Sequence, residues 1–251
     1  MTLLNIITVT KDDFEGFSKT IQSTRELRKN FDVLHIIIDS STSKVKQKID
    51  EAISLEEKII YKWQPPSGIS NAFNLGLEIS SGEWIWFLNG GDILIEGLDT
   101  SLFLNILSKS DADAIIFQTE YMQAGKKLKN PPLWALWPPL LSWIPHPSTI
   151  VKREIYKKFN GFNKNLKLAM DYEFWIKCFS NNVIVDLISI PIVKFDQLGA
   201  STEQNSKTRA EVRNIIRRYF WIIFKRLFWQ VRIILKSFII SSRFYEKKRQ
   251  I

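Results

Sequence analysis

Two carboxylates stand where runs of apolar residues end. Asp39 follows "HIII", and Asp92 follows "WIWFL", an asparagine and two glycines. In a parallel α/β sheet, ligands bind beyond the carboxyl ends of the strands. Carboxylate oxygens are the ligands that hard divalent cations prefer, and such cations often bridge a protein acid to substrate phosphates. Glycines beside an acid would let the backbone approach a ligand closely. The two acids therefore predict a ligand site at one edge of a sheet.

Each acid also has a simpler interpretation. The Asn89–Gly90 dipeptide is the strongest short-range signal for a β-hairpin. Residues 84–95 could therefore fold back on themselves and leave Asp92 in a solvated turn. Acids are also common in the turns that follow strands, so Asp39 could be a plain loop residue. The residues alone leave both alternatives open.

Alternating strands and helices would place these acids. Apolar runs at 3–9 and 33–39 flank the segment 12–30, which has acids at its start and basic residues at its end, as suits a helix dipole. This strand–helix–strand unit predicts parallel pairing. The strand at 83–88 is apolar on both faces and should lie centrally in a covered sheet. The expected class is α/β with a mostly parallel central sheet. Further strands are expected at 58–63, 113–122 and 183–195, further helices at 44–55, 68–80, 98–110 and 170–182, and a strand followed by a helix at 148–162.

Two parts of the chain break this pattern. The segment 130–145 contains five prolines and three tryptophans, so it cannot form a regular helix or a central strand. From Lys207 onward the sequence is helical in pattern and strongly basic. We therefore expect a catalytic domain at 1–205 and a basic helical extension at 206–251.

Composition limits the class of protein. A hydrophobic content of 45% and a charged content of 24% are those of an ordinary folded protein. The single cysteine, Cys178, cannot form an intrachain disulfide and lacks the partners of a zinc site, which suits a reducing compartment. The first ten residues indicate a strand rather than a signal peptide, and no uncharged run is long enough to span a bilayer.

The positive charge is concentrated in the extension. The whole chain carries +9, whereas residues 207–251 alone carry 13 basic and 2 acidic residues. The remaining 206 residues carry 22 basic and 24 acidic side chains and are nearly neutral. Such asymmetry indicates an acidic partner surface, either nucleic acid or anionic lipid.

A set of motifs in fixed order resembles a known family. Over roughly residues 1–205 the chain is similar to family-2 glycosyltransferases of the GT-A fold, of the kind that build bacterial surface polysaccharides. Each motif is short, but five in order at suitable spacings are specific. They are "TVTKDDFEGFSKTIQS", "IIIDSSTS", "GISNAFNLGLEISSGEWIWFLNGGD", "HPSTIVKREIYKKFNGFN" and "MDYEFW".

The resemblance implies roles on the donor side. Asp39 looks like the acid that contacts the nucleoside of the donor, although its motif is one residue shorter and Ser43 replaces a second acid. Asn89 and Asp92 occupy the metal-binding region, with Asp92 as the main ligand of Mg²⁺ or Mn²⁺. Pro66 and Asn71 stand where relatives carry acids. The implied donor contacts are Thr8, Thr10, Asp39, Gly68, Asn71, Asn74 and Asn89.

Asp171 matches the acid that serves as the catalytic base in inverting members of the family. It would take the proton from an acceptor hydroxyl that attacks the face opposite the leaving group, a form of help typically worth about 10²–10⁴-fold in rate. The alternative is that Asp171 is an N-cap or first-turn acid of the helix that follows it.

Two further positions fall on the acceptor side in this resemblance. His146 is expected near the acceptor, although a lone histidine is more often a structural hydrogen-bonding group. Trp143, with Trp134 and Trp137, forms either the core of a small subdomain or an exposed apolar lip that contacts sugar or lipid. His35, inside a strand, is expected to serve packing.

The extension predicts a helix that lies on an anionic membrane surface. At about 100° per residue, one set of basic residues shares a narrow arc and one set of apolar residues lines another face. A basic face with aromatic flanks fits interfacial binding, and the alternative is a helix packed on the catalytic domain. The basic set is Arg218, Lys225, Arg232, Lys236 and Arg243, the apolar set is Phe220, Ile223, Leu227, Val231, Ile234 and Phe238, and Arg226 breaks the pattern.

Taken with the resemblance, these features predict a metal-dependent, inverting glycosyltransferase. It would move a sugar from a nucleoside-diphosphate donor to a saccharide or polyprenyl-linked acceptor, in the cytoplasm at the inner face of the cell membrane. Two other classes compete. A catalytically inactive relative would act as a scaffold, and a nucleic-acid-binding protein would use the basic extension, although such proteins usually carry the basic patch on the folded face. No nucleic-acid partner is expected.

Overall fold

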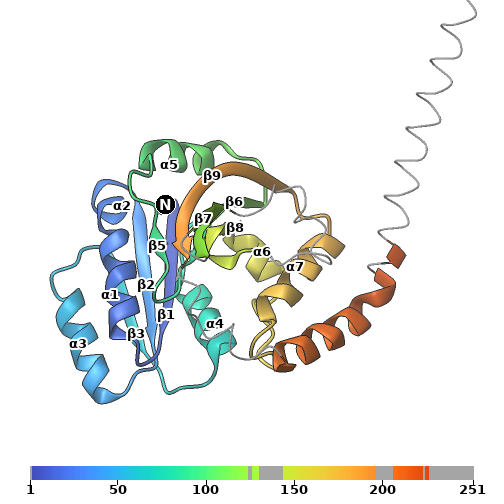
Figure 1. Cartoon of the computed structure of the whole chain (residues 1–251), viewed down its shortest axis with the longest axis horizontal. Helices are drawn as coiled ribbons and strands as arrows, with labels where there is room; N and C mark the ends of the chain where they lie inside the picture. Colours follow the sequence, from blue (N-terminus) through green and yellow to red (C-terminus); the bar gives the residue numbers. More distant parts are fainter. Residues whose placement is uncertain (1, 124–125, 130–143, 196–205, 223, 226–251) are drawn as a thin grey trace, which may run out of the picture.

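The computed structural model describes residues 2–123, 126–129, 144–195, 206–222 and 224–225. A nine-stranded sheet lies between two layers of helices, with strand order β3-β2-β1-β4-β8-β6-β9-β5 and β7 paired to β6 (Figure 1). The strands are β1 Leu4–Thr10, β2 Val33–Asp39, β3 Ile59–Trp63, β4 Trp84–Phe87, β5 Ile93–Leu94, β6 Ala114–Gln123, β7 Lys126–Lys129, β8 Thr149–Lys152 and β9 Val185–Phe195. The helices are α1 Phe14–Ser23, α2 Arg25–Asn30, α3 Ser43–Ile53, α4 Ile69–Ile79, α5 Thr100–Lys109, α6 Arg153–Lys158 and α7 Met170–Ser180, with the 3₁₀ turn η2 at His146–Ser148.

The sheet is mixed, so the prediction of a mostly parallel sheet is wrong for its second half. β3, β2, β1 and β4 run parallel to one another, as the strand–helix–strand pattern predicts. Beyond β4, the pairings β4–β8, β8–β6, β6–β7 and β9–β5 are antiparallel, and only β6–β9 is parallel. The parallel half places the carboxyl ends of β1, β2 and β4 at one edge.

The hairpin interpretation of residues 84–95 is also wrong. β5 pairs antiparallel with β9 and does not pair with β4. β4 instead lies between β1 and β8, with its four residues all buried. Such a strand needs apolar side chains on both faces, which explains the uninterrupted run from Trp84 to Leu88.

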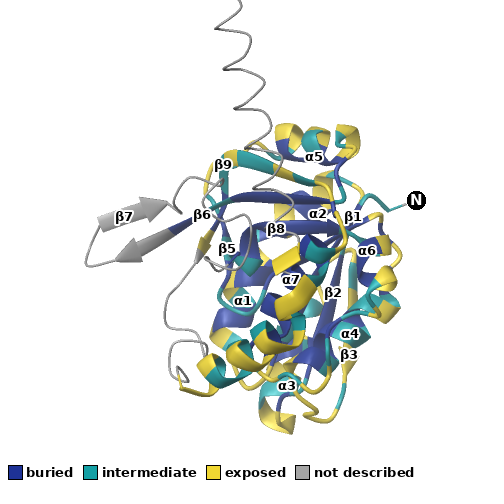
Figure 2. Cartoon of the chain, turned by 90° about the vertical axis from the view of Figure 1, so that its right-hand side faces the viewer, coloured by how far each residue is buried: buried dark blue, intermediate teal, exposed yellow. Residues whose placement is uncertain are grey.

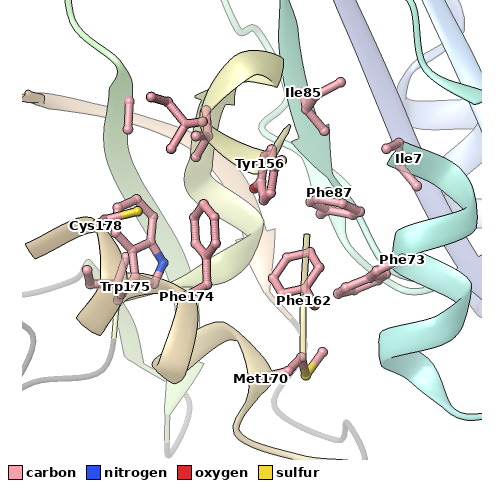
Figure 3. Close-up of a cluster of buried hydrophobic side chains, with 14 of the residues drawn as sticks. Ile7, Phe73, Ile85, Phe87, Tyr156, Phe162, Met170, Phe174, Trp175 and Cys178 are labelled. Carbon is pink, nitrogen blue, oxygen red and sulfur yellow. The ribbon is translucent and has the colours of Figure 1, made fainter. Parts of the chain in front are cut away.

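Two hydrophobic clusters lie on opposite faces of the sheet. One joins the sheet to α4, α6 and α7, and aromatic side chains form its centre. Figure 3 shows four rings converging there: Phe73 of α4, Phe87 of β4, Phe162 of the loop between α6 and α7, and Phe174 of α7. The other cluster joins the sheet to α2, α5 and β5. In Figure 2 the central strands are buried, whereas the outer sides of the helices are exposed.

The segment 12–30 forms two helices where one was expected. α1 ends at Ser23 and α2 begins at Arg25. Between them, the buried hydroxyl of Thr24 donates to the carbonyl oxygens of Thr20 and Ile21, 3.1 Å from each. A threonine that bonds back to the preceding turn often bends a helix.

A helix at 206–222 packs against α7 (Figure 1). Ile215 is 2% exposed and joins Ala169, Tyr172 and Ile176 in one apolar cluster. This described part of the extension therefore fits the packed-helix alternative on the side that faces α7. Among the residues that the structure describes, no helix is long and apolar enough to cross a membrane.

Candidate active site

Three parallel strands end side by side at the edge where ligands were expected. Thr10, Asp39 and Trp63 are in register at the carboxyl ends of β1, β2 and β3. Asp39 is fully buried, so it is not a solvated loop residue. Its carboxylate accepts hydrogen bonds from the Ser41 amide and the Tyr61 hydroxyl, each at 2.8 Å. These hydrogen bonds hold the Asp39 carboxylate beneath this edge, and its contact with the donor stays a prediction.

A pocket of about 590 Å³ opens above these strand ends. Its lining includes the indole of Trp63, which is 40% exposed, together with Lys11 and Lys46. The ammonium group of Lys46 also donates to Asp50 Oδ2 at 2.6 Å. An aromatic face beside cations suits a ligand with a flat ring and negative charge. The lining residues are Lys11, Asp12, Ser40, Ser41, Thr42, Ser43, Lys46, Trp63 and Pro66.

Hydrogen bonds between two loops hold the rim of this pocket. Asp12 Oδ1 accepts from both the amide and the hydroxyl of Thr42 at 2.8 Å, and the Asp12 amide donates to Ser41 Oγ at 2.8 Å. The hydrogen bond from the Thr42 amide lowers the pKa of Asp12 most, and the hydrogen bond from the Thr42 hydroxyl lowers it further. The Trp63 indole N–H donates to the Ser41 carbonyl oxygen at 3.0 Å, which fixes the ring at the rim.

Asp92 lies in a tight loop after β4 and is only 4% exposed. The Asn89 amide donates to Asp92 Oδ2 at 2.8 Å, and the Asp92 amide donates to the Asn89 carbonyl oxygen at 3.1 Å. Burial raises the pKa of Asp92 to about 7, and the hydrogen bond from Asn89 offsets this only in part. The carboxylate is thus kept in a setting that penalises its negative charge.

The two glycines of this loop serve its contact with α1. A Cβ at Gly90 would lie 3.4 Å from the Phe17 amide nitrogen, so this position approaches α1 closely. Gly91 has a φ of 98°, which favours glycine. Thr20 Oγ1 donates toward the carbonyl oxygens of Asn89 and Asp92 and accepts from the Gly91 amide. Sequence reasoning missed Thr20, because nothing in its surroundings marks a contact with a loop about 70 residues away.

Asn89 and Asp92 together offer a donor set that fits a hard divalent cation. Asn89 Oδ1 is a buried oxygen that has no hydrogen-bond partner within the described structure. An amide oxygen and a carboxylate suit Mg²⁺ or Mn²⁺, whose remaining positions are commonly filled by substrate phosphates and water. The described residues contain no cluster of three or more His, Cys, Asp or Glu side chains that could hold a metal without such help.

Three of the predicted donor contacts lie at α4, and two of them, Asn71 and Asn74, hydrogen-bond to the backbone of the protein. Gly68 is the N-cap of α4 with a φ of 97° and open space around it. Asn71 Nδ2 donates to the Ser67 carbonyl oxygen. Asn74 forms a two-way clamp on Phe162, accepting from its amide and donating to its carbonyl oxygen, both at 2.8 Å. The clamp of Asn74 holds the loop that leads toward α7.

Thr8 and Thr10 have different surroundings on β1. The Thr8 hydroxyl is fully buried and lies 2.8 Å from His35 Nε2. His35 is fully buried, so the expectation that it serves packing is confirmed, with hydrogen bonds to Thr8 and Thr24 added. Thr10 instead ends β1 beside Asp39, and its hydroxyl donates to the Asp13 carbonyl oxygen at 3.4 Å.

Asp171 lies in the first turn of α7 and is 8% exposed. The N-cap of α7 is Ala169, so the alternative that Asp171 caps the helix is wrong, and it is a first-turn acid. Asp171 Oδ1 accepts from the Tyr172 amide at 2.7 Å. Met170, beside it, packs in the aromatic cluster, which anchors this turn (Figure 3).

His146 begins η2 and packs against two aromatic rings that also contact each other. Its ring centroid lies 5.3 Å from those of both Phe73 and Phe87. Loss of solvent lowers the pKa of His146 to about 4, so the imidazole is neutral at neutral pH. Trp143, Trp134 and Trp137 lie outside the described residues.

A buried acid on α7 links this helix to the C-terminal one. Glu173 is 1% exposed, and its Oε1 accepts from Asn163 Nδ2 at 3.1 Å and from Arg218 Nη1 at 3.2 Å. Lys177 lies 3.3 Å from the other oxygen. Arg218 was expected on the basic arc of a helix at the membrane surface, but its guanidinium reaches toward α7. Sequence reasoning did not mark Glu173 within "MDYEFW".

Relatives and solved structures share this architecture. An uncharacterized glycosyltransferase of Methanocaldococcus jannaschii is 24% identical over 77% of this chain and 70% of its own length. A PGL/p-HBAD biosynthesis glycosyltransferase of Mycobacterium bovis is 24% identical over 59% of this chain and 58% of its own. S. aureus TarS 1-349 superposes with a TM-score of 0.62 at 17% identity, covering 76% of this chain, which spans 60% of that protein. A mannosyltransferase from Pyrobaculum calidifontis, in complex with GDP-Man and Mn²⁺, superposes with a TM-score of 0.57 at 13% identity. The superposition covers 78% of this chain and 58% of the mannosyltransferase.

The family profile described as Glycosyl transferase family 2 matches residues 5–181, more than half of the chain. The match extends from the first strand through α7, and so includes the pocket at the strand ends, Asp92 and Asp171. This chain belongs to glycosyl transferase family 2.

Proposed function

We propose that this protein transfers a sugar from a nucleoside-diphosphate donor to an acceptor hydroxyl, with inversion at the anomeric carbon. The observation that carries the proposal is the pocket at the ends of β1, β2 and β3. Its exposed Trp63 ring and its lysines suit a nucleobase and a charged diphosphate. S. aureus TarS has been solved in complex with UDP-GlcNAc, which supports a nucleotide sugar as donor.

The proposed base is Asp171, at the start of α7. During attack, its carboxylate would accept the proton of the acceptor hydroxyl, while the oxygen of that hydroxyl forms the new bond to the anomeric carbon. The nucleoside diphosphate leaves from the opposite face. Asn89 and Asp92 would hold Mg²⁺ or Mn²⁺, and a metal bound there would offset the charge of the leaving diphosphate.

The acceptor is a saccharide or a polyprenyl-linked sugar, and the protein lies at the inner face of the cell membrane. Four exposed apolar side chains support a membrane surface as partner. Phe220, Trp221, Ile222 and Phe224 are between 49% and 69% exposed, among the last described residues of the extension. Arg209, Arg213, Arg217 and Lys225 are exposed on the same helix. Aromatic side chains mixed with cations fit the interface of an anionic bilayer.

A screen of nucleotide sugars tests the proposal. UDP-GlcNAc, GDP-mannose and other common donors would be incubated with the full-length protein, Mn²⁺ or Mg²⁺, and saccharide or lipid-linked acceptors. We expect metal-stimulated release of the nucleoside diphosphate from one donor, together with a product of inverted configuration. A folded protein that binds a nucleotide sugar without turning it over would support the alternative of an inactive scaffold. That alternative is favoured by one observation: each carboxylate oxygen of Asp39 already accepts a hydrogen bond, one from Ser41 and the other from Tyr61.

A further inference from the structure

The carboxylate of Glu211 accepts three consecutive backbone amides that precede α7. Oε1 accepts from the Lys167 amide at 3.0 Å, and Oε2 accepts from the amides of Leu168 at 3.0 Å and Ala169 at 2.9 Å. Ala169 is the N-cap of α7, and its side chain accepts no hydrogen bond. Lys167 and Leu168 precede the helix, so Glu211 binds the amide of the N-cap and the two amides before it. A capping side chain accepts from amides inside the first turn, whereas Glu211 ties the entry of α7 to another helix.

The helix that carries Glu211 is itself held against α7. Ile215, one turn further along, is 2% exposed against Ala169, Tyr172 and Ile176. Two turns along, Arg218 reaches the buried carboxylate of Glu173. A negative group at a helix N-terminus is also favoured by the helix dipole. The position of Glu211 is thus set by packing, and its carboxylate can order the chain in front of α7.

The same segment is held from its other side by α4. Ser70 Oγ donates to the Leu166 carbonyl oxygen at 2.6 Å, and Asn74 clamps Phe162. In the described structure, Glu211 provides side-chain hydrogen bonds to the backbone at Lys167, Leu168 and Ala169. Asp171 follows the last of these amides by two residues, so a change in that backbone moves its carboxylate.

We propose that Glu211 is a positioning residue for glycosyl transfer, which fixes the first turn of α7 and with it the carboxylate of Asp171. The inference rests on the proposed function of Asp171 as the base. It makes the C-terminal helix part of the catalytic unit. A displacement of about 1 Å in a reacting group can cost on the order of 10²-fold in rate. Loss of Glu211 should therefore lower kcat far more than it changes donor affinity, because the donor pocket lies at the ends of β1, β2 and β3.

The test compares full-length Glu211→Ala and Glu211→Gln with Asn214→Ala, an exposed position on the same helix. Release of UDP or GDP from UDP-GlcNAc or GDP-mannose gives kcat and KM. We expect kcat to fall about 10- to 100-fold in Glu211→Ala, with the donor KM within about twofold. Glu211→Gln keeps one acceptor oxygen, so its kcat should lie between those of Glu211→Ala and the wild type. Asn214→Ala should match the wild type.

Hydrogen–deuterium exchange at the amides of 167–169 gives a readout that does not need activity. These amides should exchange faster in Glu211→Ala and keep their protection in Asn214→Ala. Unchanged exchange, or unchanged kcat with faster exchange, would overturn the positioning role. A rise in KM at constant kcat would overturn it as well. If the wild type transfers no sugar at all, the proposed function fails, whereas the exchange measurement still decides whether Glu211 orders the start of α7.

Discussion

Asn89 and Asp92 close a four-residue loop on themselves at the end of the buried strand β4. The Asn89 amide donates to the Asp92 carboxylate at 2.8 Å, and the Asp92 amide donates back to the Asn89 carbonyl oxygen at 3.1 Å. The carboxylate is therefore placed by its own loop and is removed from water. Burial raises the pKa of Asp92 from 3.8 to about 7. This single fact links the stability of the protein to pH and to a bound cation.

The first prediction is that Asp92 makes the metal-free protein less stable as pH rises. Between about pH 4 and pH 7 the unfolded chain loses this proton while the folded chain keeps it, so the free energy of unfolding falls with rising pH. The upper limit of the loss is about 4 kcal/mol, at about 1.4 kcal/mol per pKa unit. Asp92→Asn should be more stable than the wild type at pH 8 in EDTA and nearly equal to it at pH 4. Urea denaturation at the two pH values measures this, with the exposed Asp111→Asn as control. Equal pH slopes in wild type and Asp92→Asn would contradict it.

The second prediction concerns the metal. Mn²⁺ with UDP or GDP should raise the Tm of the wild type, because a cation favours the ionised form of Asp92. Asp92→Ala should lose both this increase and sugar transfer, while circular dichroism shows an intact fold. Thr20→Val offers a comparison, because it removes the hydroxyl that ties the loop to α1 and leaves the carboxylate in place. Full activity in Asp92→Ala would end the assignment of Asp92 as metal ligand.

The third prediction is that Asp171→Asn separates binding from chemistry. The amide oxygen of the new side chain can still accept from the Tyr172 amide, so the first turn of α7 should keep its structure. Donor affinity, measured by calorimetry, should stay within a few-fold of that of the wild type. Turnover should fall by about 10²–10⁴-fold, because an amide cannot take the proton of the acceptor. NMR of the product gives the anomeric configuration, and retention would refute the mechanism even if Asp171 proves essential.

The fourth prediction is that the Trp63 ring contributes to nucleotide binding. Trp63 is 40% exposed and lines the pocket beside Lys11 and Lys46. Stacking of a base on an aromatic ring is worth about 1–3 kcal/mol, so Trp63→Ala should raise the Kd for UDP or GDP about 5- to 100-fold. Trp63→Phe keeps a ring but loses the hydrogen bond to Ser41, so its Kd should lie between those of the wild type and Trp63→Ala. A Kd for Trp63→Ala equal to that of the wild type would place the base elsewhere.

The sequence predicts the parallel half of the fold well because its signals are local. The helices α3 and α4 of this half begin and end within two residues of the expected bounds, since apolar periodicity marks them. The same holds for α5, where Asp99 also caps the first turn, and for α7. The strand β5 was missed because it has two residues and pairs with β9, about a hundred positions along the chain. The antiparallel half was missed for the same reason, because strand partners are chosen by distant contacts.

In the candidate site too, local signals were predicted from the sequence and contacts between distant residues were not. The sequence placed Asp39 and Asp92 at the carboxyl edge of the sheet, and the parallel order of β2, β1 and β4 confirms this geometry. It could not predict that Tyr61 covers Asp39, because that contact depends on the register of β2 with β3. Nor could it predict Glu211, whose amide partners lie more than forty residues away. Such contacts depend on how whole elements pack, which no local pattern encodes.

The last prediction concerns the exposed face of the C-terminal helix. This helix has two sides with different tasks. Val212, Ile215 and Ile216 pack toward α7, whereas Phe220, Trp221 and Phe224 are 49%, 69% and 52% exposed. Leaving such a cluster in water is costly, since burial of apolar surface is worth about 25 cal/mol per Å². An anionic lipid surface would remove the cost and attract the exposed cations, at about 1 kcal/mol for each Lys or Arg close to the surface.

The full-length protein with Phe220→Ser, Trp221→Ser and Phe224→Ser should therefore bind phosphatidylglycerol vesicles at least 10-fold more weakly than the wild type. Arg213→Gln with Arg217→Gln should weaken binding mainly at low salt, because salt screens exposed charges. Leu55→Ser with Ile184→Ser is the matched control, since these apolar side chains are 93% and 61% exposed in loops elsewhere in the protein. Flotation of vesicles in a density gradient measures the bound fraction. If the serine variant floats with the vesicles as well as the wild type does, or if the wild type ignores anionic vesicles at low salt, this face does not bind membrane.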